Sequence, residues 1–96
     1  MKIMVLSYRC KHTEALLASG DCHRNWQGFA RIARRKLLLL DSVQELHDLR
    51  VPPGNRLEAL KKDRLGQYSI RINDQYRICF VWRNGDAYQV EIVDYH

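Results

Sequence analysis

The chain has few cysteines, and it lacks long apolar runs, internal repeats and low-complexity tracts. Its three cysteines, Cys10, Cys22 and Cys79, are an odd number without the spacing of a disulfide framework, which favours a reducing cytosol over secretion. The apolar run within residues 1–8 is followed by no signal-peptide pattern, and no stretch approaches the ~20 apolar residues of a membrane span. We therefore expect a soluble cytoplasmic protein with no membrane partner.

The length and charge of the chain limit its organisation and its partners. Ninety-six residues, of which 46% are hydrophobic and 28% charged, are typical of one folded domain, so we expect a single domain over residues 1–96. Sixteen Lys and Arg residues against eleven Asp and Glu residues give a net charge of +5. This excess favours a polyanionic partner, and RNA, DNA or an acidic protein would each satisfy it.

The N-terminal half has the pattern of one strand and two helices. Residues 2–8 are rich in apolar side chains and predict a first strand. Thr13 is a suitable N-cap, and Gly20 a suitable stop, for a short helix between them. Residues 27–40 predict an amphipathic helix, because apolar residues recur at steps of three and four. Its apolar side consists of Phe29, Ile32, Ala33, Leu37 and Leu40, and its basic side of Arg31, Arg34, Arg35 and Lys36.

The C-terminal half has the two-residue period of strands. A loop with a short helical turn, ended by the prolines at 52 and 53, precedes predicted strands at 56–60, 68–73, 76–83 and 86–96. On the last of these, Tyr88, Val90 and Ile92 are predicted to share a face. Asn84 and Gly85 indicate a tight hairpin, because both central positions of a type I′ turn need positive φ. The order predicts an α+β fold with the helices on one face of an antiparallel sheet.

Strand alternation predicts what the other face of this sheet displays. If Ile70 and Ile78 point to the helices, Arg71 and Arg77 point away from them, and Arg77 contributes little to core burial. Further charged and aromatic side chains gather near these strands: Glu58, Lys61, Lys62, Arg64, Asp94, Tyr95 and His96. A solvated sheet with scattered arginines is one interpretation.

RNA cleavage is the sharper interpretation of the same residues. Lys and Arg bind phosphate, an aromatic ring stacks on an unpaired base, and His with Glu transfers protons near neutral pH. Attack by a ribose 2′-OH on its own 3′-phosphate needs a base, an acid and cations for the charge on phosphorus, but no metal or other cofactor. The sequence contains each of these groups.

Three motifs identify a resemblance to a known family. The segment "LEALKKDRLGQYSIRINDQYRICFVW", the later "NGDAY" and the terminal "DYH" closely resemble the HigB toxins of the RelE superfamily. The match is specific over residues 55–96 and looser over the remainder. The resemblance implies a RelE-like, microbial-ribonuclease-like fold and a toxin that cleaves messenger RNA in the ribosomal A site. It also implies neutralisation by a HigA-type helix-turn-helix antitoxin, with operator DNA contacted only through the antitoxin complex.

The resemblance also implies roles for individual residues. The family's lysine corresponds to Lys61, its strand arginine to Arg77, and its terminal residues to Asp94, Tyr95 and His96. Many members have "LHPLKGD" where this chain has "LEALKKD", so Glu58 replaces a histidine and Lys62 a glycine. We accordingly assign Glu58 as the base, His96 as the acid, Lys61 and Arg77 as stabilisers of charge, and Tyr95 as an orienting or stacking group. Substrate contacts are assigned to Lys62, Arg64, Arg71 and Asp94, and ribosome contacts to Arg31, Arg34, Arg35 and Lys36.

Two other functions remain open from the sequence. A gyrase-poisoning toxin of the ParE type shares the fold but has no need of a terminal histidine. A noncatalytic nucleic-acid-binding module explains the charge but not the convergence of Glu58, Lys61, Arg77 and His96. A zinc site at Cys10, His12, Cys22 and His23 is a weaker interpretation, because these spacings match no closed zinc pattern.

Overall fold

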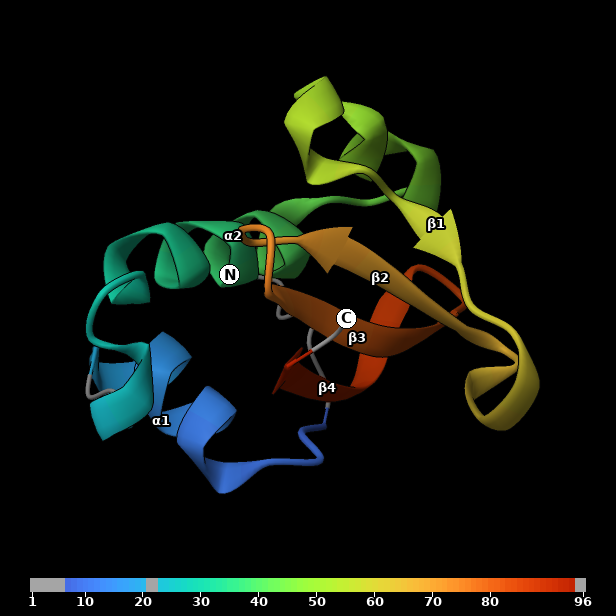
Figure 1. Cartoon of the computed structure of the whole chain (residues 1–96). Coiled ribbons are helices and arrows are strands. Elements are labelled where there is room, and N and C mark those ends of the chain that lie inside the picture. Colours follow the sequence, from blue (N-terminus) through green and yellow to red (C-terminus); the bar gives the residue numbers. More distant parts are fainter. Residues whose placement is uncertain (1–6, 21–22, 95–96) are drawn as a thin grey trace.

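A computed structural model describes residues 7–20 and 23–94 of the chain. It contains the helices α1 (Lys11–Ser19) and α2 (Ala30–Ser42) and the strands β1 (Glu58–Ala59), β2 (Gln67–Arg71), β3 (Tyr76–Arg83) and β4 (Asp86–Asp94). Short 3₁₀ turns connect them: η1 (Arg24–Trp26), η2 (Leu46–Arg50), η3 (Pro53–Asn55) and η4 (Lys62–Arg64). The strands form one antiparallel sheet in the order β1-β2-β3-β4, with both helices to one side of it, as predicted (Figure 1). No helix within these ranges is long and apolar enough to cross a membrane.

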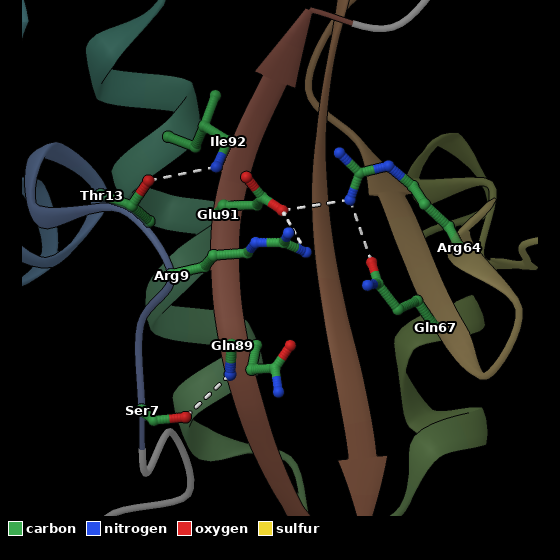
Figure 2. Close-up of polar contacts among 8 residues, drawn as sticks. All are labelled: Ser7, Arg9, Thr13, Arg64, Gln67, Gln89, Glu91 and Ile92. Carbon is green, nitrogen blue, oxygen red and sulfur yellow. Dashed lines mark hydrogen bonds and ion pairs between the residues drawn. The ribbon is translucent and has the colours of Figure 1, made fainter.

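The first helix has the predicted end but a different beginning. Gly20 follows α1 in the left-handed conformation at φ 82°, and its N–H donates to the Leu16 carbonyl at 3.0 Å, which is a common helix ending. The N-cap position belongs to Cys10, so the prediction of Thr13 was wrong. Thr13 is fully buried inside the helix, and its Oγ1 accepts the backbone N–H of Ile92 at 3.1 Å (Figure 2). The hydroxyl therefore joins α1 to β4.

The second helix begins three residues later and ends two residues later than predicted, and its apolar side is narrower. It begins at Ala30 rather than at residue 27, because Trp26 and Phe29 close a turn through a 3.0 Å backbone hydrogen bond. Ala33, Leu37 and Leu40 are fully buried, as predicted. Ile32 is 38% exposed, so its place on the buried side was wrongly predicted.

The core lies between the helices and one face of the sheet. Ile70, Ile78 and Phe80 on this helix-side face are fully buried, as alternation predicted. The turn between β3 and β4 has the positive φ values expected of its type, 53° at Asn84 and 85° at Gly85. The sheet is therefore built from the predicted strands.

A β-bulge changes the predicted alternation of β4. Cys79 pairs with Glu91, but Val81 pairs with Tyr88, so β4 carries one extra residue in this interval. Gln89 has a φ of 52°, and its N–H donates to Ser7 Oγ at 2.8 Å (Figure 2). Tyr88 consequently lies on the face of the sheet opposite to Val90 and Ile92. The prediction that the three residues share a face was therefore wrong.

Only the end of the predicted N-terminal strand falls within the part of the chain that the structure describes. Tyr8 forms a parallel bridge with Val90, the Val90 N–H donates to the Ser7 carbonyl at 3.1 Å, and the Arg9 N–H donates to the Val90 carbonyl at 3.0 Å. Residues 7–9 therefore run along the outer edge of β4. This contact brings Arg9 close to the sheet.

Candidate active site on the open face of the sheet

The sheet has a second face that neither α1 nor α2 covers, and one row of residues crosses it. The register pairs Glu58 with Ser69, Ser69 with Cys79, and Cys79 with Glu91. Directly paired residues share a face, so these four side chains form one line across β1, β2, β3 and β4. We call them the open-face row. Ser69 and Cys79 in its centre are fully buried, so other side chains cover them.

Arg77 supplies part of that cover. Its Nε donates to Ser69 Oγ at 2.7 Å, and its Nη2 donates to the Arg56 carbonyl at 2.6 Å. The same Nη2 lies 3.7 Å from a Glu58 carboxylate oxygen. Arg77 points away from the helices, as predicted, and it lies outside the apolar core, but only 12% of its side chain is exposed. The loop at Arg56 therefore lies against the Arg77 side chain and shields it from solvent.

Glu58 lies at the rim of two hollows. One hollow, of about 530 Å³, is bordered by η2, by β1 and by the β3–β4 turn. The other, of about 330 Å³, is lined by residues 58–62, which include Lys61 and Lys62. Half of the Glu58 side chain, 51%, is exposed, and both lysines are exposed. The structure therefore brings the predicted base, lysine and strand arginine together at the β1 edge.

The predicted substrate-binding residues do not form one group. Arg71 pairs with Arg77 in the register and forms an ion pair with Asp74. Asp94 pairs with Tyr76, so strand alternation places it on the helix-side face of the sheet. Its Oδ2 accepts a hydrogen bond from Gln75 Nε2 at 3.0 Å. Arg64 lies farther along the open-face row, at Glu91. Tyr95 and His96 lie outside the described residues.

The predicted basic side of α2 divides into two parts. Arg31 and Arg35 are exposed. Arg34 is turned toward α1, where its Nε donates to the Leu16 carbonyl at 3.1 Å and its Nη2 to the Leu17 carbonyl at 3.4 Å. Lys36 donates to Asn55 Oδ1, and burial, with Arg35 and Arg71 nearby, lowers the Lys36 pKa. Arg34 and Lys36 therefore hold α1 and η3 against α2.

The larger hollow contains residues that sequence reasoning missed. His47, Arg50, Tyr68 and Trp82 line it together with Glu58. The two aromatic residues lie on the core side of β2 and β3, where they are half-buried against the core. Their position at the sheet end, close to a charged turn, was the signal that could have found them.

Cys79 connects the two ends of the open-face row. Burial raises the pKa of its thiol to about 11, and Arg64, Glu91, Arg77 and Glu58 all contribute to the electrostatic field around it. Charges from both ends of the row therefore meet over this sulfur. A buried, neutral thiol is a poor nucleophile and a poor metal ligand.

Among the described residues, metal-ligating residue types also gather outside the row. The potential ligand atoms of Glu45, His47 and Asp48 lie within 4.8 Å of one another, but all three residues are exposed, and Glu45 and Asp48 form the capping box of η2. His12 and His23 pack edge to face, with ring centroids 4.8 Å apart, while Cys22 of the weaker zinc interpretation lies outside the described residues. Capping and ring packing account for these contacts.

Comparison with known proteins identifies relatives over most of the chain. A family model described as "RelE-like toxin of type II toxin-antitoxin system HigB" matches residues 6–96. The chain is 53% identical to Toxin HigB-1 of Vibrio cholerae over 85 residues, which are 88% of this chain and 90% of that protein. It is 38% identical to Endoribonuclease HigB of Proteus vulgaris over 61 residues, covering 64% and 65% of the two chains.

The fold is also similar to that of a solved structure with much lower sequence identity. A chain of the YoeB dimer from Staphylococcus aureus superposes with a TM-score of 0.54 at 16% sequence identity, over 100% of this chain and 99% of that one. This likeness concerns the fold alone. It agrees with the RelE-like architecture that the motifs implied.

Proposed function

Because the chain belongs to the HigB-like family of RelE-like toxins of type II toxin–antitoxin systems, we propose that it is an endoribonuclease that cleaves messenger RNA in the ribosomal A site and so inhibits translation. Its site of action would be the cytoplasm, where ribosomes translate. As a member of such a system it has an antitoxin partner, for which we propose a HigA-type helix-turn-helix protein. Operator DNA would be contacted only through that complex.

The contact between Glu58 and Arg77 is the observation that best supports this function. Cleavage through the 2′-OH needs a carboxylate or imidazole to take the proton and a fixed cation beside the phosphate. Arg77 is fixed on two sides, by Ser69 and by the Arg56 carbonyl, and its outer nitrogen lies 3.7 Å from the half-exposed Glu58. Glu58 would accept the 2′ proton while Arg77 stabilises the charge that develops on the phosphate oxygens.

The remaining roles are assigned to neighbours of this pair. Lys61, in the hollow that it shares with Glu58, would contact the scissile phosphate as a second cation. His96 would protonate the departing 5′ oxygen, and Tyr95 would orient the substrate. The products would be a 2′,3′-cyclic phosphate and a 5′-hydroxyl.

The larger hollow would receive an unpaired base of the codon. Tyr68 and Trp82 offer aromatic surface there, and stacking on such rings is how proteins hold single-stranded RNA bases. Arg31 and Arg35, the exposed part of the basic side of α2, would contact ribosomal RNA. Arg34 and Lys36 would contribute mainly by holding α1 and η3.

A cleavage assay on programmed ribosomes tests the proposal. Purified protein is added to ribosomes carrying a defined messenger, and the 5′ ends of the products are mapped. We expect cleavage in the A-site codon that disappears when the nucleotide on the 5′ side of the cleaved bond is 2′-deoxy. Glu58→Gln and His96→Gln should each slow single-turnover cleavage by on the order of 10²–10⁴, the usual effect of one positioned base or acid.

Three results would contradict the proposal in different ways. Gyrase-dependent DNA breaks without messenger cleavage would indicate a ParE-type toxin. Binding of RNA without any cleavage would indicate a noncatalytic module. Cleavage of the 2′-deoxy messenger at the normal rate would show that the 2′-OH is not the nucleophile.

A further inference from the structure

A second cluster of charges lies at the far end of the open-face row. Glu91 of β4 contacts Arg64 Nη1 at 3.1 Å and Arg9 Nη1 at 3.7 Å, through the same carboxylate oxygen. Figure 2 shows the two guanidinium groups meeting at this carboxylate, with Arg9 from the segment before α1 and Arg64 from η4. We call these three residues the Glu91 cluster. Two guanidiniums share one carboxylate, so the cluster carries an excess positive charge.

The cluster is held in place by its surroundings. Arg64 Nη1 also donates to Gln67 Oε1 at 3.1 Å. The backbone N–H of Arg9 is bonded to the Val90 carbonyl, which fixes the start of its side chain beside β4. The Glu91 side chain is only 15% exposed, whereas 56% of the Arg9 side chain is exposed. The buried carboxylate therefore anchors two arginines that reach the surface to different extents.

The contact between Arg9 and Glu91 is the weaker of the two. At 3.7 Å it is longer than a hydrogen bond, and an exposed ion pair of this kind contributes little free energy. Arg9 can therefore turn its N–H groups to another anion without breaking a strong bond. Phosphate is the anion that fits best, because a planar guanidinium can donate two parallel hydrogen bonds to it.

The cluster is too far from the candidate active site to act on the same phosphate. Glu91 and Glu58 are the two ends of the open-face row, three strand spacings apart. At ~4.8 Å per spacing this separation is ~14 Å. An RNA strand that crosses the face from β1 to β4 would bring a different phosphate to each end.

We propose that Arg9 and Arg64 form a phosphate-binding subsite for the RNA backbone, with Glu91 as the residue that positions both guanidiniums. The subsite binds a phosphate beyond the one that is cleaved, and it fixes the path of the messenger across the sheet. The proposal rests on the proposed function. It adds Arg9 and Glu91, which have no role in the chemistry, to the residues that hold the RNA. It also assigns Arg64 to a different phosphate from the one that Lys61 contacts.

Neutralising single phosphates tests the subsite. Ribosomes are programmed with a short messenger that carries a 2′-deoxy nucleotide at the cleaved bond and one uncharged methylphosphonate at successive positions. We expect one position away from the cleaved bond where the methylphosphonate weakens binding of the wild-type protein by about fivefold, the effect of one exposed charge contact. Arg9→Gln should bind this messenger and the one without a methylphosphonate with the same affinity. Its slope of log affinity against log salt should fall by about 0.7.

Matched variants separate this contact from overall charge and from folding. Arg24→Gln removes one exposed positive charge from η1 and should keep the wild-type slope and the wild-type response to the methylphosphonate. Arg9→Lys keeps the charge and should recover part of the affinity. On an all-ribose messenger at saturating protein, Arg9→Gln should cleave within about twofold of wild type, because its role is binding rather than chemistry.

The outcomes distinguish the subsite from the function on which it rests. If the wild type cleaves the messenger but Arg9→Gln shows the wild-type salt slope and the wild-type response to every methylphosphonate, the subsite is overturned and the proposed function stands. If the wild type neither binds nor cleaves the programmed messenger, both are overturned.

Discussion

The centres of the two faces of the sheet are both fully buried, but by different means. On the helix-side face, Ile70, Ile78 and Phe80 are fully buried against apolar side chains of the helices. On the open face, Ser69 and Cys79 are also fully buried, but the groups around them are the charged side chains of Arg77, Arg64, Glu58 and Glu91. Apolar contact stabilises one face, whereas the other depends on hydrogen bonds and ion pairs with fixed geometry.

This difference explains how a chain of this size can present charged groups without losing its fold. Apolar packing tolerates no voids but needs no directional contacts. A charged cover needs satisfied hydrogen bonds, and Arg77 makes them to Ser69 and to the Arg56 carbonyl. Arg77 therefore contributes to stability as well as to the proposed chemistry.

The largest effect on stability is expected on the helix-side face. Phe80→Ala removes a fully buried aromatic ring and leaves a cavity, which should lower the free energy of unfolding by about 3–5 kcal/mol. Ser69→Ala on the open face leaves the Nε of Arg77 without its acceptor and should cost only about 1–3 kcal/mol. Urea denaturation of both variants measures the contrast. Equal losses would mean that the two faces are stabilised alike.

Arg77→Ala is expected to affect both stability and activity. Its loss leaves the Arg56 carbonyl and the Ser69 hydroxyl without their partner, which should lower the free energy of unfolding by about 1–3 kcal/mol. Single-turnover cleavage should fall by about 10²–10³, as for removal of one donor to a developing negative charge. Arg77→Lys keeps the charge but not the contacts to both Ser69 and the Arg56 carbonyl. Its cleavage rate should therefore lie between those of the wild type and Arg77→Ala. Wild-type cleavage by folded Arg77→Ala would remove Arg77 from the mechanism.

Much of this fold could be predicted because its periodicities are clean. Steps of three and four gave α2, steps of two gave β2, β3 and β4, and Asn84-Gly85 gave the hairpin. The bulge at Gln89 could not be predicted, since its register shift, its positive φ and its bond to Ser7 appear only in the folded chain. Thr13 was misplaced for a similar reason, because its hydroxyl is satisfied by β4, which lies far away in the sequence.

The candidate site was predicted less completely than the fold. Alternation gave the direction of Arg77 correctly, but its burial depends on a loop carbonyl at Arg56 that no strand pattern contains. Arg34 looked like part of a solvated basic side, yet it bonds the last carbonyls of α1. Contacts made by loops and helix ends are tertiary, so a local pattern of residue types does not encode them.

The Cys79 thiol provides a smaller test of the open face through pH. Its pKa is raised from 9.0 to about 11, so the folded state favours the neutral thiol. This contribution is complete below pH 9 and is lost as the pH rises toward 11. Between pH 8 and pH 10.5 the wild type should lose on the order of 1 kcal/mol more unfolding free energy than Cys79→Ser.

The comparison with Cys79→Ser isolates the thiol from other groups that titrate in this range. Burial also raises the pKa of Tyr8, to about 12, which acts in the same direction, and Lys36 has a lowered pKa, which acts in the opposite one. Both groups are present in the wild type and in the variant, so their effects cancel. Identical pH dependence of the two proteins would mean that the charged cover admits water to the sulfur.

The smallest effect is expected at Lys62, where this chain departs from the "LKGD" pattern of many relatives. Lys62 has a φ of 56°, a left-handed conformation that costs a non-glycine residue about 1–2 kcal/mol. Glycine adopts it without strain but loses more entropy on folding, by about 0.5–1 kcal/mol, so Lys62→Gly should stabilise the fold by less than about 1 kcal/mol. Lys62→Ala is the matched control, since it also removes the charge but keeps the strain. Thermal unfolding should rank the glycine variant above the alanine variant, and the reverse order would mean that the loop beside the open face relaxes when the side chain is shortened.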